Sequence, residues 1–208
     1  MELVALIGSG GHAKVVEQMV EQSFTKVKIV AKLDDRFTNK FFKRGVLYGP
    51  IEEVFKLIHY GVKMIVTIGD NRIRKKVVNR LALGEEHFTN LIHLKAVVAD
   101  DLEVGKGTVI MPGAIINADV EIGSHCIINS GCIVEHDNRI GPFAHICPGA
   151  VMTGNVHVKE GVMLGANSTI LPGLEVGSWS TVGAGSTVTR SMAGHITAVG
   201  SPALEVGT

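Results

Sequence analysis

An aliphatic side chain recurs at every sixth position through the second half of the chain, and no insertion breaks the phase. The series has sixteen members, which are Val98, Val104, Ile110, Ile116, Ile122, Ile128, Val134, Ile140, Ile146, Met152, Val158, Leu164, Ile170, Val176, Val182 and Val188. Four positions after each member comes a second slot that is generally small, as at Ala114, Cys126, Cys132, Ala144 and Ala150. So strict a period predicts a repeat architecture for this half of the chain.

Each six-residue unit predicts a short strand followed by a corner. Glycine often follows the aliphatic residue directly, as at Gly105, Gly123 and Gly141, where a sharp turn needs an unhindered backbone. Three such sides close a triangular coil of about 18 residues, so the units make roughly five coils of a parallel β-helix. The aliphatic and small residues then point inward, which agrees with a chain of 25 glycines and only 5% aromatic residues. The period leaves the hand of the coil open.

The first ninety residues have a different pattern, in which apolar strands alternate with helices. We expect strands over residues 3–7, 27–31, 64–68 and 88–92, and helices over residues 13–22, 51–59 and 72–83. This alternation predicts a small Rossmann-like parallel α/β sheet. The boundary is expected just before the repeats begin, which gives a first domain of residues 1–93 and a second domain of residues 94–208.

A glycine-rich turn joins the first expected strand to the first expected helix. Gly8, Gly10 and Ala13 match the G-x-G-x-x-A form of the dinucleotide fingerprint, and Asp34 and Asp35 follow the next strand. Glycine lets the backbone approach a phosphate, and the helix N-terminus supplies free N–H donors. Because about ninety residues build only one mononucleotide-binding half, we expect a nucleotide or its diphosphate here rather than intact NAD. The alternative is a tight turn that binds nothing.

Charge is balanced over the chain, with 20 Lys and Arg against 20 Asp and Glu, so no net field draws it to nucleic acid or to an anionic membrane. One local exception is the start of the helix expected at residues 72–83, where Arg72, Arg74, Lys75 and Lys76 gather. These side chains either meet phosphates or form a solvated helix face.

Other features bear on where the protein works. No apolar run approaches the roughly 18 residues that a membrane-spanning helix needs, and the first residues lack the basic segment of a secretory signal. The three cysteines have no C-x-x-C spacing, which argues against a disulfide framework and a thiolate zinc site. We therefore expect a cytoplasmic protein, with Cys126 and Cys132 packed in the core.

The unit pattern of an aliphatic residue, glycine and a small residue resembles the hexapeptide acyltransferases. That resemblance implies a left-handed β-helix, a homotrimer and acetyl-CoA bound between neighbouring prisms. The segments GSGGHA, LDD, IGDNRIRKK and NLIH before the repeats, and GSPA at residues 200–203, narrow the resemblance. Over residues 1 to about 203 the chain resembles the bacterial nucleotide-amino-sugar N-acetyltransferases, which include bacillosamine- and perosamine-pathway enzymes and the related sialic acid O-acetyltransferases.

The resemblance assigns binding roles to residues in both domains. It places Gly10, Gly11 and His12 at the diphosphate and sugar of a nucleotide sugar, and Asp34, Asp35, Gly69 and Asp70 around the nucleoside. It places His145, Gly154, Ala166 and Ala184 at acetyl-CoA, with Gly154 as the backbone N–H of an oxyanion site. A surface histidine is the alternative for His145.

Acetyl transfer to an amine needs a base, and histidine is the side chain best matched to that task near neutral pH. His136 is the histidine with a carboxylate on each side, in Glu135-His136-Asp137. The resemblance makes His136 the base and Asp137 its supporting acid, although familiar relatives carry the longer glutamate there. The alternative is a solvated corner histidine. Asn138 fills an inward slot, so its amide either braces this turn or bonds across coils.

The expected reaction is acetyl-CoA-dependent N-acetylation of the 4-amino group of a nucleotide-linked 4-amino-4,6-dideoxy sugar, with UDP as the expected nucleotide. The amine is expected to attack the thioester directly, and no metal is expected. O-acetylation of sialic acid or another sugar hydroxyl is the alternative within the class. A zinc enzyme of the γ-carbonic anhydrase type would need converging histidines. His125, His136 and His145 are 11 and 9 residues apart, which is not a multiple of 18, so they do not stack on one face. A silent nucleotide-sugar sensor is the last alternative.

Overall fold

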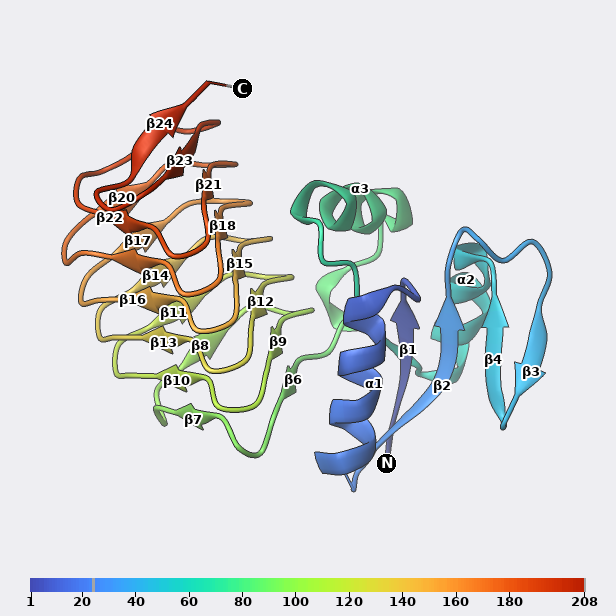
Figure 1. Ribbon diagram of the computed structural model, residues 1–208. Coiled ribbons are helices and arrows are strands. Elements are labelled where there is room, and N and C mark those ends of the chain that lie inside the picture. The colour runs from blue at the N-terminus through green and yellow to red at the C-terminus, as the bar shows by residue number, and fades with distance from the viewer. Residues whose placement is uncertain (24, 208) are drawn as a thin grey trace. The chain divides into compact units, whose positions relative to one another are not determined.

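The computed structural model describes residues 1–23 and 25–207, and the chain divides into two compact units, Met1–Asn90 and Leu91–Thr208 (Figure 1). The first unit is an α/β domain and the second is a three-sided parallel β-helix. In the described part of the chain, no helix is long and apolar enough to cross a membrane.

The first unit is built on a five-stranded sheet in the order β3-β4-β2-β1-β5. Its strands are β1 (Glu2–Ile7), β2 (Val27–Leu33), β3 (Phe41–Lys43), β4 (Val46–Gly49) and β5 (Lys63–Val66). Its α-helices are α1 (Gly11–Ser23), α2 (Val54–Leu57) and α3 (Asn71–Leu81), and its 3-10 helices are η1 (Ile51–Glu53), η2 (Ile58–Tyr60) and η3 (Glu85–His87). Neighbouring strands run parallel except for the antiparallel hairpin of β3 and β4. The helix expected at residues 51–59 is therefore a short α-helix between two 3-10 turns.

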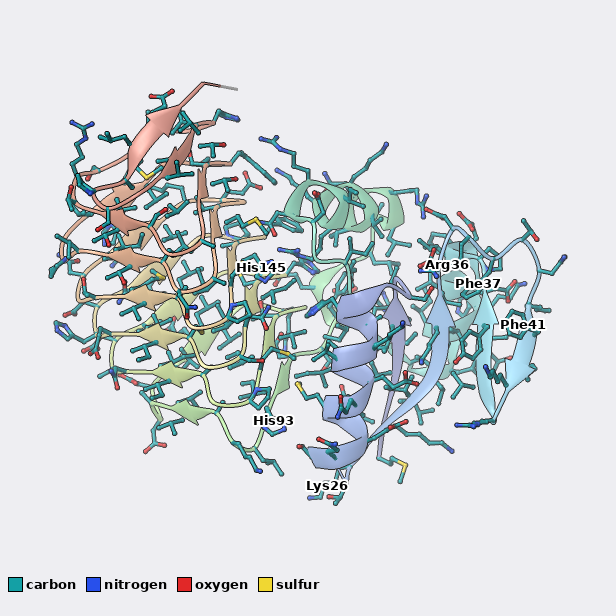
Figure 2. The ribbon with its side chains drawn as sticks, in the orientation of Figure 1. Lys26, Arg36, Phe37, Phe41, His93 and His145 are labelled. Atoms are coloured by element: carbon teal, nitrogen blue, oxygen red, sulfur yellow. The ribbon has the colours of Figure 1, made fainter. Side chains whose placement is uncertain are left out.

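The β3–β4 hairpin is an element that the strand and helix pattern does not predict. Arg44 and Gly45 both have positive φ, at 51° and 78°, and make the turn. The Phe41 and Tyr48 rings stack with their centroids 5.1 Å apart, and Phe37 packs edge-on against both. Figure 2 labels Phe37 and Phe41. Strand β3 has only three residues and is exposed along its whole length, so no alternation of buried and exposed positions marks it as a strand.

Strand β1 lies between β2 and β5, at the point where the strand order of this sheet reverses. The chain leaves β1 through α1 to reach β2 on one side, and later enters β5 on the other side. Ligands of open parallel sheets bind at such a reversal of strand order, beyond the carboxyl ends of the strands. The loops that follow Ile7, Leu33 and Val66 all leave the sheet at this edge.

The second unit has three faces. The six-stranded face holds β7 (Val97–Val98), β10 (Ile115–Ile116), β13 (Ile133–Val134), β16 (Val151–Met152), β19 (Thr169–Ile170) and β22 (Thr187–Val188). The five-stranded face holds β8 (Glu103–Val104), β11 (Glu121–Ile122), β14 (Arg139–Ile140), β17 (His157–Val158) and β20 (Glu175–Val176). The eight-stranded face holds β6 (Leu91–Ile92), β9 (Val109–Ile110), β12 (Ile127–Ile128), β15 (His145–Ile146), β18 (Met163–Leu164), β21 (Thr181–Val182), β23 (Thr197–Val199) and β24 (Leu204–Val206).

The register of the faces agrees with the period of the sequence. Ile116 pairs with Val134, and Val134 pairs with Met152, each 18 positions further on. These aliphatic residues are fully or nearly fully buried inside the prism. Strand β6 pairs with β9, so residues 91 and 92, expected in a strand of the first domain, begin the β-helix instead. Phe88 is joined to Met64 of β5 by an isolated bridge outside the named strands.

Each edge of the prism carries a column of residues in the left-handed region. The edge between the six-stranded and five-stranded faces, here called the six–five edge, has Asp119, Asp137, Asn155 and Gly173 in this column, with φ between 56° and 72°. Asp, Asn and Gly are the residues that adopt this conformation at least cost. The corners of this edge therefore follow from local chain preference as well as from packing.

Replacing Ile116 with alanine is expected to lower the free energy of unfolding by about 2–5 kcal/mol, because it leaves a cavity in the core. Ile116 is 1% exposed, whereas its neighbour Ile115 on β10 is 36% exposed and is the matched control. The Ile115→Ala variant should lose about 1 kcal/mol or less. Denaturant titration followed by circular dichroism measures both, and equal losses would contradict the inward assignment of the six-residue series.

Candidate active site

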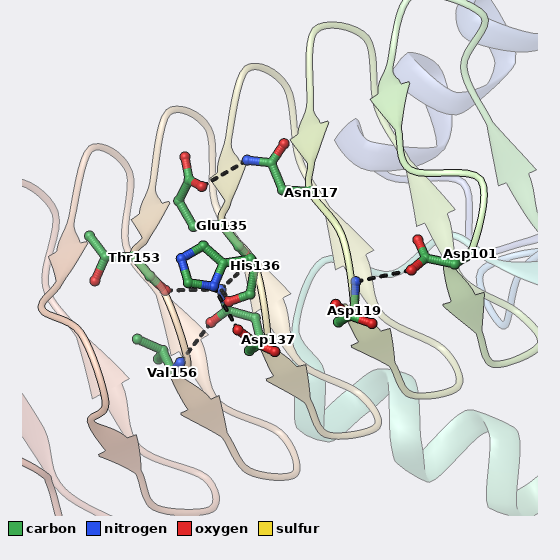
Figure 3. A network of polar contacts seen from close by, with 9 residues as sticks. Asp101, Asn117, Asp119, Glu135, His136, Asp137, Thr153 and Val156 are labelled. Atoms are coloured by element: carbon green, nitrogen blue, oxygen red, sulfur yellow. Dashed lines mark hydrogen bonds and ion pairs between the residues drawn. The ribbon is translucent and has the colours of Figure 1, made fainter.

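His136 and Asp137 form a close pair on the six–five edge, in the corner between β13 and β14. Asp137 has φ of +60°, and this turn brings the two neighbouring side chains together instead of pointing them to opposite faces. The His136 Nδ1 atom lies 2.7 Å from Asp137 Oδ2 (Figure 3). A carboxylate that accepts the Nδ1 proton leaves Nε2 as the basic nitrogen. Both side chains are more than half exposed, so the pair lies on the surface of the prism.

The charges around His136 favour its protonated form. The hydrogen bond with Asp137 is the main cause that raises the pKa of His136 above its ordinary value, and the charges of Asp137, Glu135 and Asp119 act in the same direction. Glu135 is itself oriented by Asn117, whose amide Nδ2 donates to its Oε2 at 2.8 Å (Figure 3). The imidazole is therefore a stronger base than an isolated histidine.

Asn138 holds this corner from inside the prism. The side chain is fully buried, and its Nδ2 donates to the carbonyl oxygens of Glu135 at 2.5 Å and Thr153 at 2.9 Å. Its Oδ1 accepts the Val156 N–H at 3.0 Å. Both sequence-based alternatives hold, because Asn138 braces the turn that carries His136 and also bonds the corner of the next coil.

Gly154 lies against the His136 ring in the next coil. A Cβ atom built on Gly154 would be 2.7 Å from both His136 Nε2 and His136 Cε1, closer than real Cβ contacts. Any side chain at this position would push the imidazole away. Because Gly154 has no side chain, it can lie directly beside His136 and Asp137 on the six–five edge.

His145 lies away from this edge, on β15 of the eight-stranded face (Figure 2). It is 8% exposed, so the alternative of a surface histidine is wrong for this chain. Its Nε2 lies 3.0 Å from the amide Nδ2 of Asn129. Ala166 and Ala184 occupy corners that join the eight-stranded face to the six-stranded face. One chain therefore places His136 and Gly154 on one edge, and His145, Ala166 and Ala184 elsewhere on the prism.

Asp34 organises the glycine-rich loop of the first unit. Its Oδ2 accepts the Ser9 N–H at 2.7 Å and the Ser9 hydroxyl at 2.8 Å, and its Oδ1 accepts the Arg36 N–H. Partial burial alone would raise the pKa of Asp34, but these hydrogen bonds from Arg36 and Ser9 lower it below its ordinary value. Asp34 is thus an ionised support of the loop that precedes Gly10 and Gly11.

The other predicted nucleoside residues have partners within the first unit. Asp35 forms a two-pronged ion pair with Arg80 of α3, at 2.8 and 3.0 Å. Asp70 caps α3, and its Oδ1 accepts the Ile73 N–H at 2.8 Å. The Gly69 carbonyl accepts a hydrogen bond from Arg74. The role of Arg80 could not be predicted from the sequence, because 45 residues separate it from its partner Asp35.

Gly10 and Gly11 lie in open space at the start of α1. A Cβ atom at either position would have no heavy atom within 4 Å. Helix α1 begins at Gly11, so its first N–H groups have no partner within the helix and face the loop. This geometry suits an anion such as a diphosphate, with His12 in the same first turn.

The buried residues His125, Cys132 and Cys147 do not form a second catalytic or metal-binding site. Among residues 1–23 and 25–207, no group of three or more His, Cys, Asp or Glu side chains could hold a metal ion. His125 is buried and stacks on Phe143 with ring centroids 5.1 Å apart, on a different edge from His136. Burial raises the pKa of Cys132 to about 12 and that of Cys147 to about 11, which keeps both as thiols near neutral pH.

A hexapeptide prism with an exposed histidine–aspartate pair, joined to an α/β unit with a glycine-rich loop, defines the class of hexapeptide transferases. Residues 3–81 match the PglD N-terminal domain, and residues 101–136 and 155–190 match the bacterial transferase hexapeptide of six repeats. The chain belongs to the family of sugar N-acetyltransferases that join these two parts, and its β-helix has the left-handed fold of that family.

Three relatives illustrate this membership. The perosamine N-acetyltransferase from Caulobacter crescentus, solved with CoA and GDP-perosamine, has a TM-score of 0.89 and 34% identity and covers 100% of this chain and 98% of its own. The acetyltransferase domain of PglB from Neisseria gonorrhoeae, solved with acetyl coenzyme A, has a TM-score of 0.87, 30% identity and 99% coverage of both chains. The UDP-N-acetylbacillosamine N-acetyltransferase of Bacillus subtilis is 42% identical over 116 residues, which are 53% of this chain and about half (52%) of that relative.

Replacing Asp137 with asparagine is expected to lower the pKa of His136 toward its ordinary value of 6.5, because the amide carries no charge and cannot accept the Nδ1 proton as strongly. The titration of the His136 Cε1–H signal in NMR spectra measures this shift directly. The Glu135→Gln variant is the control and should produce a smaller decrease, since Glu135 acts only through its charge. An unchanged His136 titration in the Asp137→Asn protein would contradict the pairing.

Proposed function

We propose that this protein transfers the acetyl group of acetyl-CoA to the 4-amino group of a nucleotide-linked 4-amino-4,6-dideoxy sugar, with UDP as the expected nucleotide. The observation that carries the proposal is the His136–Asp137 pair over Gly154 in a chain that aligns end to end with the perosamine N-acetyltransferase bound to CoA and GDP-perosamine. The match to the Bacillus subtilis bacillosamine enzyme supports UDP as the nucleotide.

In the proposed reaction the sugar amine attacks the thioester carbonyl carbon directly. The C–N bond forms, the C–S bond breaks, and coenzyme A leaves. Nε2 of His136 takes the proton from the amine, while Asp137 holds Nδ1 and stabilises the imidazolium. The Gly154 N–H is the proposed donor to the developing oxyanion. The raised pKa values of Cys132 and Cys147 support a route without a cysteine acyl intermediate.

The first unit is the proposed nucleotide-sugar site. Gly10, Gly11 and His12 at the start of α1 would bind the diphosphate and sugar, supported by the open space at the two glycines and by the N-terminal end of the helix there. Asp34, Asp35, Gly69 and Asp70 would surround the nucleoside. Because the Asp34 and Asp70 carboxylates already accept hydrogen bonds from Ser9 and Ile73, we assign these two residues to shaping the loops.

The second unit is the proposed acetyl-CoA site, made of His145, Gly154, Ala166 and Ala184. Gly154, Ala166 and Ala184 carry no side chain beyond a methyl group, so they leave room for an extended pantetheine arm. Since His145 and the two alanines lie off the six–five edge of their own chain, they would act with the His136 of a neighbouring copy. This separation supports a homotrimer with active sites between protomers. We place the enzyme in the cytoplasm, without a metal, nucleic acid or membrane partner.

Coenzyme A release with a panel of acceptors tests the function. Turnover is expected with a UDP-linked 4-amino sugar, and weaker or no turnover with a GDP-linked 4-amino sugar, sialic acid or serine. The His136→Ala variant should lose at least about 10²-fold in kcat, the usual scale for a general base, with its circular dichroism spectrum unchanged. Turnover confined to sialic acid would replace the proposal with O-acetylation. Full activity in His136→Ala would show that His136 is not the general base.

Complementation between two weakened variants tests the shared site. His136→Ala and His145→Ala chains, each weakly active alone, are expected to regain activity when they are coexpressed. Random mixing would give intact sites in about one quarter of positions if each site takes one histidine from each of two protomers. The control is a chain with both substitutions, coexpressed with His136→Ala, which should regain nothing. No recovery in mixed trimers would contradict a site between protomers.

A further inference from the structure

The loops after β1 and β5 lie against each other at the carboxyl edge of the first sheet. Ile7 pairs with Val66 at the ends of the two parallel strands. Gly8 has φ of +100°, and a Cβ atom there would be 2.7 Å from Ile68 Cγ1 and 3.2 Å from the Thr67 carbonyl oxygen. The two loops therefore approach each other so closely at Gly8 that no side chain fits between them.

Thr67 joins these two loops by hydrogen bonds. Its side chain is buried, with 1% of the residue exposed, and its Oγ1 lies 2.9 Å from the Gly8 carbonyl oxygen and 3.1 Å from that of Ile7. The hydroxyl donates to this pair of oxygens from within the sheet. The Gly8 carbonyl is thereby held toward the interior of the unit.

Arg74 holds the second loop in the same way. It lies on the first turns of α3 and is only 1% exposed, so both sequence-based interpretations of this arginine, phosphate contact and a solvated face, are wrong. Its Nη1 donates to the carbonyl oxygens of Ile68 at 2.8 Å and Gly69 at 3.2 Å, and its Nη2 donates to Asn71 Oδ1 at 2.8 Å. One guanidinium thus fixes three acceptors around the loop from Thr67 to Asp70.

We propose that Arg74 and Thr67 are positioning residues for the diphosphate of the nucleotide sugar, an inference that rests on the proposed function of the first unit. Carbonyl oxygens that faced the start of α1 would repel an anion. Thr67 donates a hydrogen bond to the Gly8 carbonyl oxygen, and Arg74 donates to those of Ile68 and Gly69. These partially negative oxygens are therefore bonded to buried donors. The start of α1 is then left with its N–H groups as the electrostatic feature that a diphosphate meets.

Neither residue touches the ligand in this arrangement. The burial of both side chains keeps them out of the site, and the arginine acts through the loop that it bonds. Lysine cannot replace the arginine, because one ammonium group cannot reproduce the planar fork that reaches the loop carbonyls and Asn71 together. The expected defect is in nucleotide-sugar binding, not in the acetyl-transfer step.

The test compares Arg74→Lys and Thr67→Val with Val77→Ala, a variant of a buried residue of α3 that packs in the core. Both positioning variants should raise the KM for the nucleotide sugar about tenfold, with kcat and the KM for acetyl-CoA changed by less than about twofold, as expected when ground-state and transition-state binding are lost equally. Calorimetry with UDP and GDP as probes should detect the same loss of affinity. Val77→Ala should lower the Tm and leave both KM values unchanged.

Two results would overturn the inference while leaving the proposed function intact. One is binding of UDP or GDP by the unsubstituted chain with the same Kd in Arg74→Lys and Thr67→Val. The other is an equal rise in nucleotide-sugar KM in Val77→Ala, which would reduce the effect to general destabilisation. If the unsubstituted chain binds acetyl-CoA but neither UDP nor GDP, the proposed function fails and the inference falls with it. Thr67→Val keeps the side-chain shape, so it serves if Arg74→Lys does not fold.

Discussion

The stacking of each coil on the next is the interaction on which the second unit depends. A two-residue strand buries too little apolar surface to persist alone, so Val134 is held by its pairing with Ile116 and Met152 in the adjacent coils. Within the strands the repeat keeps one length, because a residue inserted there would turn the aliphatic side chain that follows it away from the core. This constraint gives the edges a constant spacing, and residues on neighbouring corners meet in columns.

The candidate active site uses that column geometry. His136 contacts Gly154 because the two positions are one coil apart, and it contacts Asp137 because the corner takes a left-handed residue there. Asn138 places a polar amide in an otherwise apolar interior, and its bonds to both corners offset the cost of burial. The same features that close the coil thus orient the base.

The β-helix, the α/β unit and the His136–Asp137 corner could be predicted from the sequence. Elements with a weak sequence pattern, and residues whose partners lie far along the chain, could not. The β3–β4 hairpin was not predicted because β3 has only three residues and shows no alternation of buried and exposed positions. Leu91 and Ile92 look like any short apolar strand, so their pairing with β9 could not be predicted from them. Arg74 sits in a basic run whose other members give no sign that this one is buried.

By itself the sequence determined the repeat, the inward series and the corner residues, since a six-residue period and a left-handed preference depend on neighbours along the chain. Only the tertiary structure decided which groups meet. It paired Asp35 with Arg80, and it bonded Arg74 to the Ile68 and Gly69 carbonyls. Hydrogen bonds and ion pairs act over a few ångströms in space, and the separation of two residues in sequence does not specify that distance.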